Sequence, residues 1–276
     1  MFAKKTNILV LLVVIMLFTG ACARKHREQI VIKGSTTVLP IAQKASESFM
    51  DMNDEIDISL SGTGSGDGIK SIIEGSCDIA NSSREMKDKE KQEAEASGKK
   101  IKEITVAYDM ICPVVHPSNP VKDLSMEQLR QIFSGQIVNW KELGGEDAEI
   151  VIISRDTSSG TYEYWQETVM KKDTKVSPEA LLMASNGAVA TYLSENKNAI
   201  GYVGHGYLNS TIKSLSVGNI EPTIENGKNG SYPIFRGLYM IIDEEKASRS
   251  TLEFIDYILS SEGQALAQDA GYIPLS

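Results

Sequence analysis

The sequence contains few of the residues that most often hold metals or perform catalysis. It has 3 cysteines and 3 histidines among 276 residues. No two cysteines are spaced as Cys-x-x-Cys, and no cysteine and histidine have the spacing of metal ligands. The sequence therefore gives no support for a structural zinc site, and we expect no bound metal.

Signature motifs of hydrolysis and of nucleotide binding are also missing. No Gly-x-Ser-x-Gly sequence surrounds Ser65 or Ser159, the two serines that could serve as nucleophiles. The glycine-rich segment 62–68 places Asp67 and Ile69 where a Gly-x-Gly-x-x-Gly motif requires glycine, and it does not match Gly-x-x-x-x-Gly-Lys. We expect neither an enzyme nor a cofactor, and a secreted hydrolase stays as a less favoured alternative.

Positive charge is scarce as well. The chain has 28 Lys and Arg against 37 Asp and Glu, which gives a formal net charge of −9. The only basic run after the first 23 residues is the short segment 24–27. A nucleic-acid partner is therefore not expected. Surface charge is screened beyond about 8 Å, so a net negative protein can still bind an anion through donors in close contact.

The N-terminus has the pattern of a secretory signal. Lys4 and Lys5 precede an apolar run over residues 8–18, which is too short for a membrane span of about 20 residues. The small residues before Cys22 resemble a lipobox, although Thr19 stands where leucine is usual. We predict a signal peptide over 1–21, lipidation of Cys22 and a tether over 22–28, with an uncleaved membrane anchor as the alternative.

The two other cysteines, Cys77 and Cys112, stand in apolar segments typical of buried strands. In such segments cysteine behaves as a small hydrophobic residue. A disulfide between them stays open, because sequence does not reveal the required geometry.

Strand-like and helix-like segments alternate along the rest of the chain. This order predicts an α/β protein with largely parallel sheets and helices on both faces. An apolar run over 104–115, interrupted at Asp109, is a candidate crossing between lobes, and the charged segment 85–100 is typical of a solvated helix. We predict strands at 30–32, 56–60, 78–80, 149–153, 199–203 and 238–242, and helices at 38–52, 69–74, 125–133, 162–170, 187–196, 249–259 and 262–269.

Four polar loops each follow a predicted strand: 34–37, 64–66, 82–84 and 155–161. Ligands of open α/β sheets bind outside the carboxyl ends of the strands, so these loops could converge on one cleft. Three of them precede helices, whose N-terminal N–H groups attract anions. Each loop taken alone is an ordinary turn or helix cap. Together with an arginine they predict a site for a tetrahedral oxyanion.

The order of these loops, with the segments Asp78-Ile-Ala-Asn-Ser-Ser-Arg84 and Ala199-Ile-Gly-Tyr-Val203, resembles the phosphate-binding lipoproteins of bacterial phosphate ABC transporters. The resemblance covers nearly the whole chain after the signal. It implies a two-lobed periplasmic-binding-protein fold of type II, with a ligand cleft between lobes joined by two crossings. Lobe I would comprise 29–109 and 238–276, and lobe II 110–237, with hinges at 108–112 and 235–238.

The resemblance also implies a set of phosphate-binding residues. Arg155 would pair with two phosphate oxygens, Thr36 would offer its hydroxyl and Thr37 its backbone N–H. The other members of the set are Ser65, Ser83, Ser159, Gly160 and Thr161. Asn186 is expected to cap a helix, with contact to the ligand as the alternative. Arg84 is expected either to donate to the anion or to pair with Glu85.

Ser83 is the departure from the family pattern, because several relatives have an aspartate there that accepts the proton of hydrogen phosphate. A serine accepts a hydrogen bond but does not repel a fully ionised anion such as sulfate. Selectivity therefore stays open, unless Asp67, Asp156 or Glu85 supplies a carboxylate.

The expected function is capture of inorganic phosphate outside the cytoplasm and its delivery to an ABC transporter. The implied partners are phosphate, the permease with its ATPase, and the cell membrane through a lipid on Cys22. The protein is expected to act as a monomer. Alternatives are a carrier of sulfate, molybdate or tungstate, and a lipid-anchored adhesin or signalling module that has kept the fold.

Overall fold

The computed structural model describes residues 27–171 and 173–275. The predicted signal peptide and Cys22 lie outside the described residues, as does most of the tether. Glu28, the predicted last residue of the tether, is instead the first residue of strand β1 (Glu28–Gly34). Within the described ranges, no helix is both long enough and apolar enough to cross a membrane.

One half of the molecule is built on parallel strands that each lead into a polar loop. The pairing aligns Ile30 with Ile58 and Ile32 with Ile79, and all four side chains are buried. Their core also includes residues from the C-terminal part of the chain, among them Phe254. The elements are β1, β2 (Ile56–Gly62), β3 (Ile79–Ser82), α2 (Leu39–Met52), α3 (Ser65–Glu74), α4 (Asp88–Ala96), α9 (Arg249–Leu259) and α10 (Ser261–Asp269).

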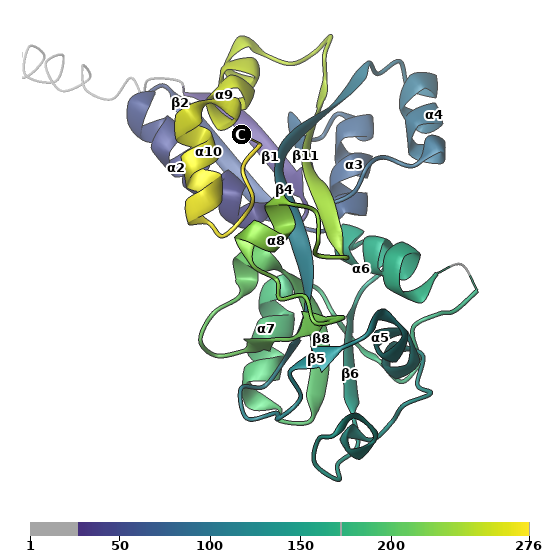
Figure 1. Cartoon of the computed structure of the whole chain (residues 1–276). Coiled ribbons are helices and arrows are strands. Elements are labelled where there is room, and N and C mark those ends of the chain that lie inside the picture. Colours follow the sequence, from purple (N-terminus) through teal and green to yellow (C-terminus); the bar gives the residue numbers. More distant parts are fainter. Residues whose placement is uncertain (1–26, 172, 276) are drawn as a thin grey trace, which may run out of the picture.

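Two strands, β4 (Ile101–Val115) and β11 (Phe235–Asp243), run antiparallel from this half into the other (Figure 1). Their pairing extends from Phe235 and Met110 to Asp243 and Ile101, with a register shift at Leu238 and Tyr239. These are the two crossings expected from the resemblance. Because β11 is antiparallel to β3 and β4 is antiparallel to β8 (Ala199–Gly204), the sheet is mixed rather than largely parallel.

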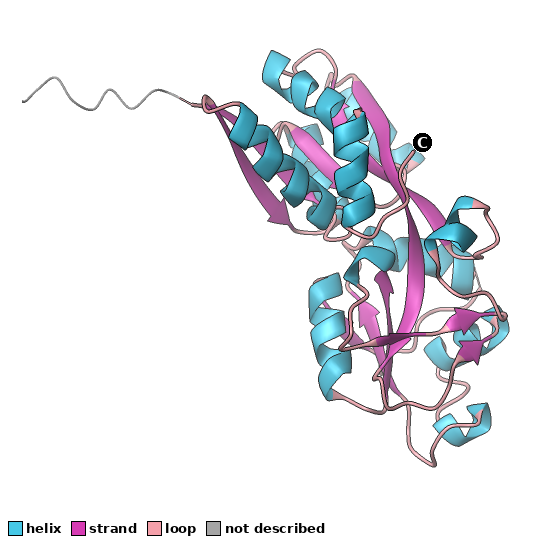
Figure 2. Cartoon of the chain, turned by 60° about the vertical axis from the view of Figure 1, so that its left-hand side comes forward, coloured by secondary structure: helices cyan, strands magenta, loops and turns pink. Residues whose placement is uncertain are grey.

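The second half repeats the arrangement of strands with outer helices (Figure 2). Trp165 stacks on Tyr202 at 4.2 Å between ring centroids, and Phe133 meets Trp165 edge-on, so aromatic rings fill its core. The larger elements here are β6 (Val151–Arg155), β7 (Leu181–Met183), β8, α5 (Met126–Phe133), α6 (Gly160–Trp165) with a π-helical turn at Gln166–Met170, and α7 (Asn186–Glu195). The smaller ones are η1 (Trp140–Leu143), η3 (His205–Tyr207), α8 (Ile224–Lys228), β9 (Lys213–Ser214) and the β5–β10 pair (Asp123–Leu124 and Ser216–Val217).

Most predicted elements lie within a few residues of the observed ones, with one informative difference. Helix α3 begins at Ser65, four residues before the predicted start, so four residues of the glycine-rich segment are helical. Glycine is a poor helix former. Here the segment is held by tertiary contacts, because Gly68 packs against the backbone of Gly34 with no room for a Cβ.

The two described cysteines are free and buried. Cys77 belongs to a small core cluster beside α3, whereas Cys112 lies in the core of the second half. Burial raises the pKa of the Cys77 thiol to about 12, and it raises the pKa of the Cys112 thiol well above its ordinary value. Both residues therefore act as apolar core residues.

Candidate anion-binding site

The four polar loops meet where the two halves of the molecule face each other. Thr37, after β1, and Thr161, at the start of α6, bring their Oγ1 atoms to 2.9 Å. Ser65, after β2, lies 3.3 Å from Ser83, after β3. The backbone N–H of Gly66 donates to the carbonyl of Ser158 at 2.9 Å. The predicted convergence of loops that are far apart in sequence is thus present in the structure.

Two glycines permit this close approach of the halves. A Cβ on Gly160 would collide with Ser65 and would lie 2.9 Å from the hydroxyl of Ser83. Gly64 has a φ of +107°, a conformation unfavourable for residues with a side chain, and a Cβ there would lie 2.8 Å from the Ser158 carbonyl. The site therefore needs glycine at both positions.

Arg155 lies at the centre of the site and is 1% exposed. Its Nε donates to the carbonyl of Met183 at 2.9 Å, and its Nη2 donates to the carbonyl of Ala184 at 3.0 Å. Its Nη1 has no hydrogen-bond partner among the described residues. Burial lowers the pKa of this guanidinium, because the charged form loses its hydration. A buried arginine with a free donor is suited to an oxyanion.

Ser159 and Thr37, two other residues predicted to bind the anion, also form hydrogen bonds within their own loops. The Ser159 hydroxyl caps α6 by accepting from the N–H of Tyr162 at 3.2 Å, which leaves its own hydrogen free. The backbone N–H of Thr37, expected to face the anion, donates to Ser35 Oγ at 3.1 Å. The side chain of Thr37, rather than its N–H, is the part that faces the other loops.

Asn186 does not cap helix α7, contrary to the main expectation. Ser185 is the cap, because its hydroxyl accepts from the N–H of Ala188 at 3.0 Å. Asn186 is the first helical residue and is fully buried. Its Nδ2 donates to Thr36 Oγ1 at 3.1 Å and to Thr37 Oγ1 at 3.0 Å. Serine and asparagine are both favoured helix caps, so only the packing assigns Asn186 to the site.

Sequence reasoning did not single out the buried ion pair of Asp109 and Arg236. Arg236 donates to Asp109 Oδ2 from Nε at 3.0 Å and from Nη2 at 2.8 Å. The same Nη2 lies 3.3 Å from Thr37 Oγ1 and 3.0 Å from Thr161 Oγ1. Both residues lie on the crossing strands, within the segments predicted as hinges. The available signal was Asp109, a carboxylate that interrupts an otherwise apolar run.

None of the three carboxylates considered as substitutes for the missing aspartate contacts Ser83. Asp67 and Glu85 are exposed. Asp156 accepts hydrogen bonds from the N–H and the hydroxyl of Ser158, at 2.9 and 2.5 Å. The polar atoms that meet Ser83 in the structure are the hydroxyl of Ser65 and, through the Ser83 carbonyl, Arg236 Nη1 at 3.2 Å.

Arg84 neither points to the anion loops nor pairs with the Glu85 carboxylate, so both expectations for it are wrong. It forms a two-pronged ion pair with Glu90, at 2.7 Å for each contact, and donates to the backbone carbonyl of Glu85. Its Nε also pairs with Glu163 of α6, in the other half. Lys87 contacts the same glutamate at 3.0 Å. This charged cluster therefore joins the two halves beside the anion site.

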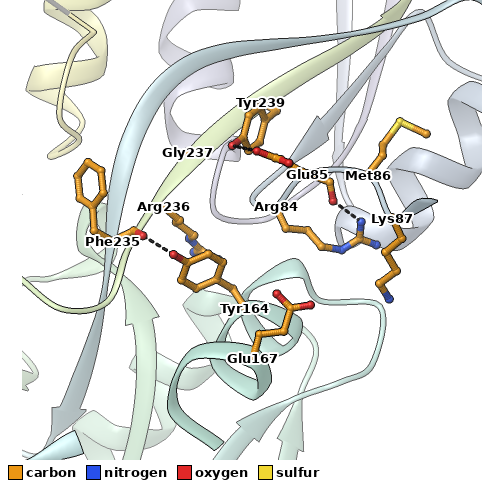
Figure 3. A pocket seen from close by; sticks show the side chains of 10 residues that line it. All are labelled: Arg84, Glu85, Met86, Lys87, Tyr164, Glu167, Phe235, Arg236, Gly237 and Tyr239. Atoms are coloured by element: carbon orange, nitrogen blue, oxygen red, sulfur yellow. Dashed lines mark hydrogen bonds between the residues drawn. The ribbon is translucent and has the colours of Figure 1, made fainter. Parts of the chain in front are cut away.

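A pocket of about 440 Å³ lies between the halves beside this cluster. Figure 3 shows Arg84, Lys87, Tyr164 and Arg236 among the side chains that line it. The hydroxyl of Tyr164 donates to the carbonyl of Phe235, so α6 is also tied to the crossing strand β11.

The described histidines do not complete a hydrolytic site. His205 uses Nδ1 to contact the carbonyl of Gly271, and His116 is paired with Ser118 away from the loops. His26 lies outside the described residues. Within the described ranges, no three His, Cys, Asp or Glu side chains are grouped as metal ligands would be.

Comparison with known proteins places this geometry in context. Residues 20–262 match the PBP superfamily domain. The chain is 32% identical to the phosphate-binding protein PstS of Borreliella burgdorferi, over 96% of this chain and 98% of the relative. It is 33% identical to PstS of Bacillus subtilis, over 91% of this chain and 82% of the relative.

Solved structures of phosphate-binding proteins are also similar to this chain. A proposed phosphate ABC transporter substrate-binding protein from Clostridium perfringens, with bound phosphate, superposes with a TM-score of 0.85 at 36% identity. That match covers 90% of this chain and all of the other. A phosphate transport receptor from Vibrio cholerae superposes with a TM-score of 0.72 at 31% identity, over 88% of this chain and 99% of the other.

Proposed function

The chain belongs to the PstS family of phosphate-binding proteins, and we propose that it captures inorganic phosphate and delivers it to the permease of an ABC transporter. The observation that carries this proposal is Arg155. It is a buried cation with one unpaired donor, and it lies among hydroxyl groups from both halves of the molecule. An oxyanion would satisfy the free donor and offset the buried charge.

In this proposal Arg155 Nη1 donates to the phosphate, together with the hydroxyls of the surrounding loops. The donating hydroxyls are those of Thr36, Ser65, Ser83, Ser159 and Thr161. Gly160 contributes its backbone N–H, and Thr37 supports this set through the hydrogen bond between its Oγ1 and that of Thr161. Hydrogen bonds to a charged partner contribute roughly 1.5 to 3 kcal/mol each. A few of them are enough for micromolar affinity, which requires about −8 kcal/mol.

We further propose that residues 29–109 with 238–276 form one lobe and residues 110–237 the other. Two features support this division. The buried side chains group into separate cores on either side of the site, and within the described residues β4 and β11 are the long strands that run between them. Movement about these strands would open and close the cleft around phosphate.

The mature protein would act outside the cytoplasm, held to the cell membrane by a lipid on Cys22 after removal of residues 1–21, and would function as a monomer. The basis is the charged, apolar and small-residue pattern before Cys22. It would bind and release phosphate unchanged, since neither Ser65 nor Ser159 has a histidine partner among the described residues.

A carrier of sulfate or molybdate is the second candidate, and Ser83 is the observation that favours it. In the described site no aspartate replaces the acidic residue that would repel a fully ionised anion, because Asp67, Asp156 and Glu85 all face elsewhere. Hydroxyl groups alone would discriminate weakly between tetrahedral oxyanions.

Calorimetric titration with phosphate, sulfate and molybdate tests the proposal. We expect heat from phosphate, and we expect Arg155→Ala to lower phosphate affinity at least 100-fold, about 3 kcal/mol, because anion oxygens lose a buried donor. Arg130→Ala is the matched control, since Arg130 is bound to Glu127 and the Val169 carbonyl, away from the loops. Stronger binding of sulfate or molybdate would favour the second candidate, and no binding of phosphate would contradict the main one.

A further inference from the structure

The threonine hydroxyls of the site are surrounded by hydrogen-bond donors. Thr37 Oγ1 lies 3.0 Å from Asn186 Nδ2 and 3.3 Å from Arg236 Nη2. Thr36 Oγ1 lies 3.1 Å from Asn186 Nδ2 and 3.4 Å from Arg155 Nη2. A hydroxyl oxygen has two lone pairs, and a guanidinium can only donate. In both threonines the oxygen therefore accepts twice, and its own hydrogen must point elsewhere.

The orientation of the Asn186 amide is set by the backbone of β8. The N–H of Gly204 donates to Asn186 Oδ1 at 3.2 Å, so this end of the amide is the oxygen. The NH₂ end consequently faces Thr36 and Thr37. Because Asn186 is fully buried, water does not compete for these bonds.

The orientation of Arg236 is fixed in a similar way. Asp109 accepts two of its donors, and Asp109 Oδ1 also accepts from the N–H of His205 at 2.9 Å. The side chains of Arg236 and Asp109 are 1% and 0% exposed. Because Asp109 balances its charge, Arg236 contributes little net attraction for an anion. Its effect on the site is to orient the hydroxyl groups of the neighbouring threonines.

A chain of hydrogen bonds follows from these constraints. Thr37, which accepts twice, has one polar neighbour left for its hydrogen, which is Thr161 Oγ1 at 2.9 Å. Thr161 then accepts from Thr37, and the two threonines share the one Nη2 hydrogen of Arg236 that is not bound to Asp109. The hydroxyl hydrogen of Thr161, like that of Thr36, is directed away from these donors and is available to an acceptor.

We propose that Asn186 and the Asp109–Arg236 pair are positioning residues, which direct the hydroxyl hydrogens of Thr36 and Thr161 toward the bound anion. The inference rests on the proposed function. Hydroxyl groups that are already oriented as donors need no reorganisation when the anion arrives, which strengthens binding without any further contact to the ligand.

The position of Arg236 also couples the orientation of these hydroxyl groups to closure of the cleft. Thr37 belongs to the loop after β1, Thr161 belongs to α6 in the other half, and Arg236 lies on the crossing strand β11 between them. One guanidinium nitrogen reaches both threonines. The set of oriented donors is complete only when the two halves are in contact, so closure and anion binding reinforce each other.

A double-mutant cycle with inorganic phosphate, measured by calorimetry, tests this role. Arg236→Lys keeps the charge but cannot reach Asp109 and both threonines, so we expect affinity to fall about 10- to 100-fold. Thr161→Val removes the hydroxyl through which Arg236 acts. In the Thr161→Val background, Arg236→Lys should cost less than about threefold. Arg249→Lys, on the exposed face of α9, is the control and should leave affinity unchanged.

Each result decides the question. Additive penalties, or an Arg236→Lys protein that binds like wild type, would overturn the positioning role while leaving phosphate binding intact. Absence of phosphate binding by the wild-type protein would overturn the proposed function and this inference with it. If circular dichroism shows that Arg236→Lys does not fold, Asn186→Leu combined with Thr36→Val provides an independent cycle with the same criteria.

Discussion

At the scale of single residues, Gly160 determines how closely the two halves can approach. An added methyl group would collide with the hydroxyls of Ser65 and Ser83, which come from the opposite half. We expect Gly160→Ala to cost the closed state about 1–3 kcal/mol. Phosphate affinity measured by calorimetry should therefore fall about tenfold or more.

Gly187→Ala is the matched control for this substitution. Gly187 lies in helix α7, and the nearest atoms to an added Cβ would be 3.8 and 3.9 Å away. Alanine should fit there and leave affinity unchanged, with a small gain in stability. Equal affinity losses in both variants would show that the close approach at Gly160 is not what limits binding.

At the scale of elements, α6 is connected to the loop after β3 by a charged cluster. Glu163 of α6 pairs with Arg84 and Lys87 of the other half, and Glu90 holds Arg84 in place. The pairs to Glu163 can exist only while the halves are in contact. Arg84 is 8% exposed and the Glu163 side chain 14%, so solvent screens this contact less than a surface ion pair.

We expect Glu163→Gln to shorten the lifetime of the phosphate complex. Loss of the partly buried charge pair should speed release about 3- to 30-fold, with a smaller change in the rate of binding. Stopped-flow measurement of phosphate release gives the rate. Glu167→Gln, one turn further along and exposed beside the same pocket, should leave it unchanged. An unchanged rate for Glu163→Gln would mean that the cluster does not hold the cleft closed.

At the scale of the whole molecule, a phosphate held by loops of both halves should stabilise the entire fold. At a phosphate concentration of 100 times Kd, binding adds about 2.7 kcal/mol to the free energy of unfolding. For a chain of this size we expect Tm to rise by about 5 °C or more. Differential scanning calorimetry measures the shift.

Two controls separate binding from an effect of salt. Potassium chloride at equal ionic strength should raise Tm far less than phosphate does. The Arg155→Ala protein should lose most of the phosphate-dependent shift. A shift of the same size in chloride, or an unchanged shift in Arg155→Ala, would show that stabilisation does not come from the site.

The sequence alone determined the alternation of strands and helices, the polar loops at strand ends and the central arginine. These are local properties: apolar periodicity, turn-forming residues and an arginine after a strand are all visible within a few neighbouring residues. The same local view misjudged the start of α3, because close packing of Gly68 on Gly34 compensates for the low helix propensity of glycine.

Only the tertiary structure decided which side chains complete the site. Asn186 follows a helix cap, Asp109 interrupts an apolar strand and Arg236 lies 127 residues further along the chain, and no local pattern connects them. Asp109 and Arg236 meet because the pairing of β4 with β11 places them opposite each other. Asn186 joins them because α7 packs against β4 and brings its amide to Thr37. Because these side chains are buried, water does not compete for their hydrogen bonds, and each donor keeps one orientation. The exclusion of water depends on the folded structure, so the sequence alone does not reveal it.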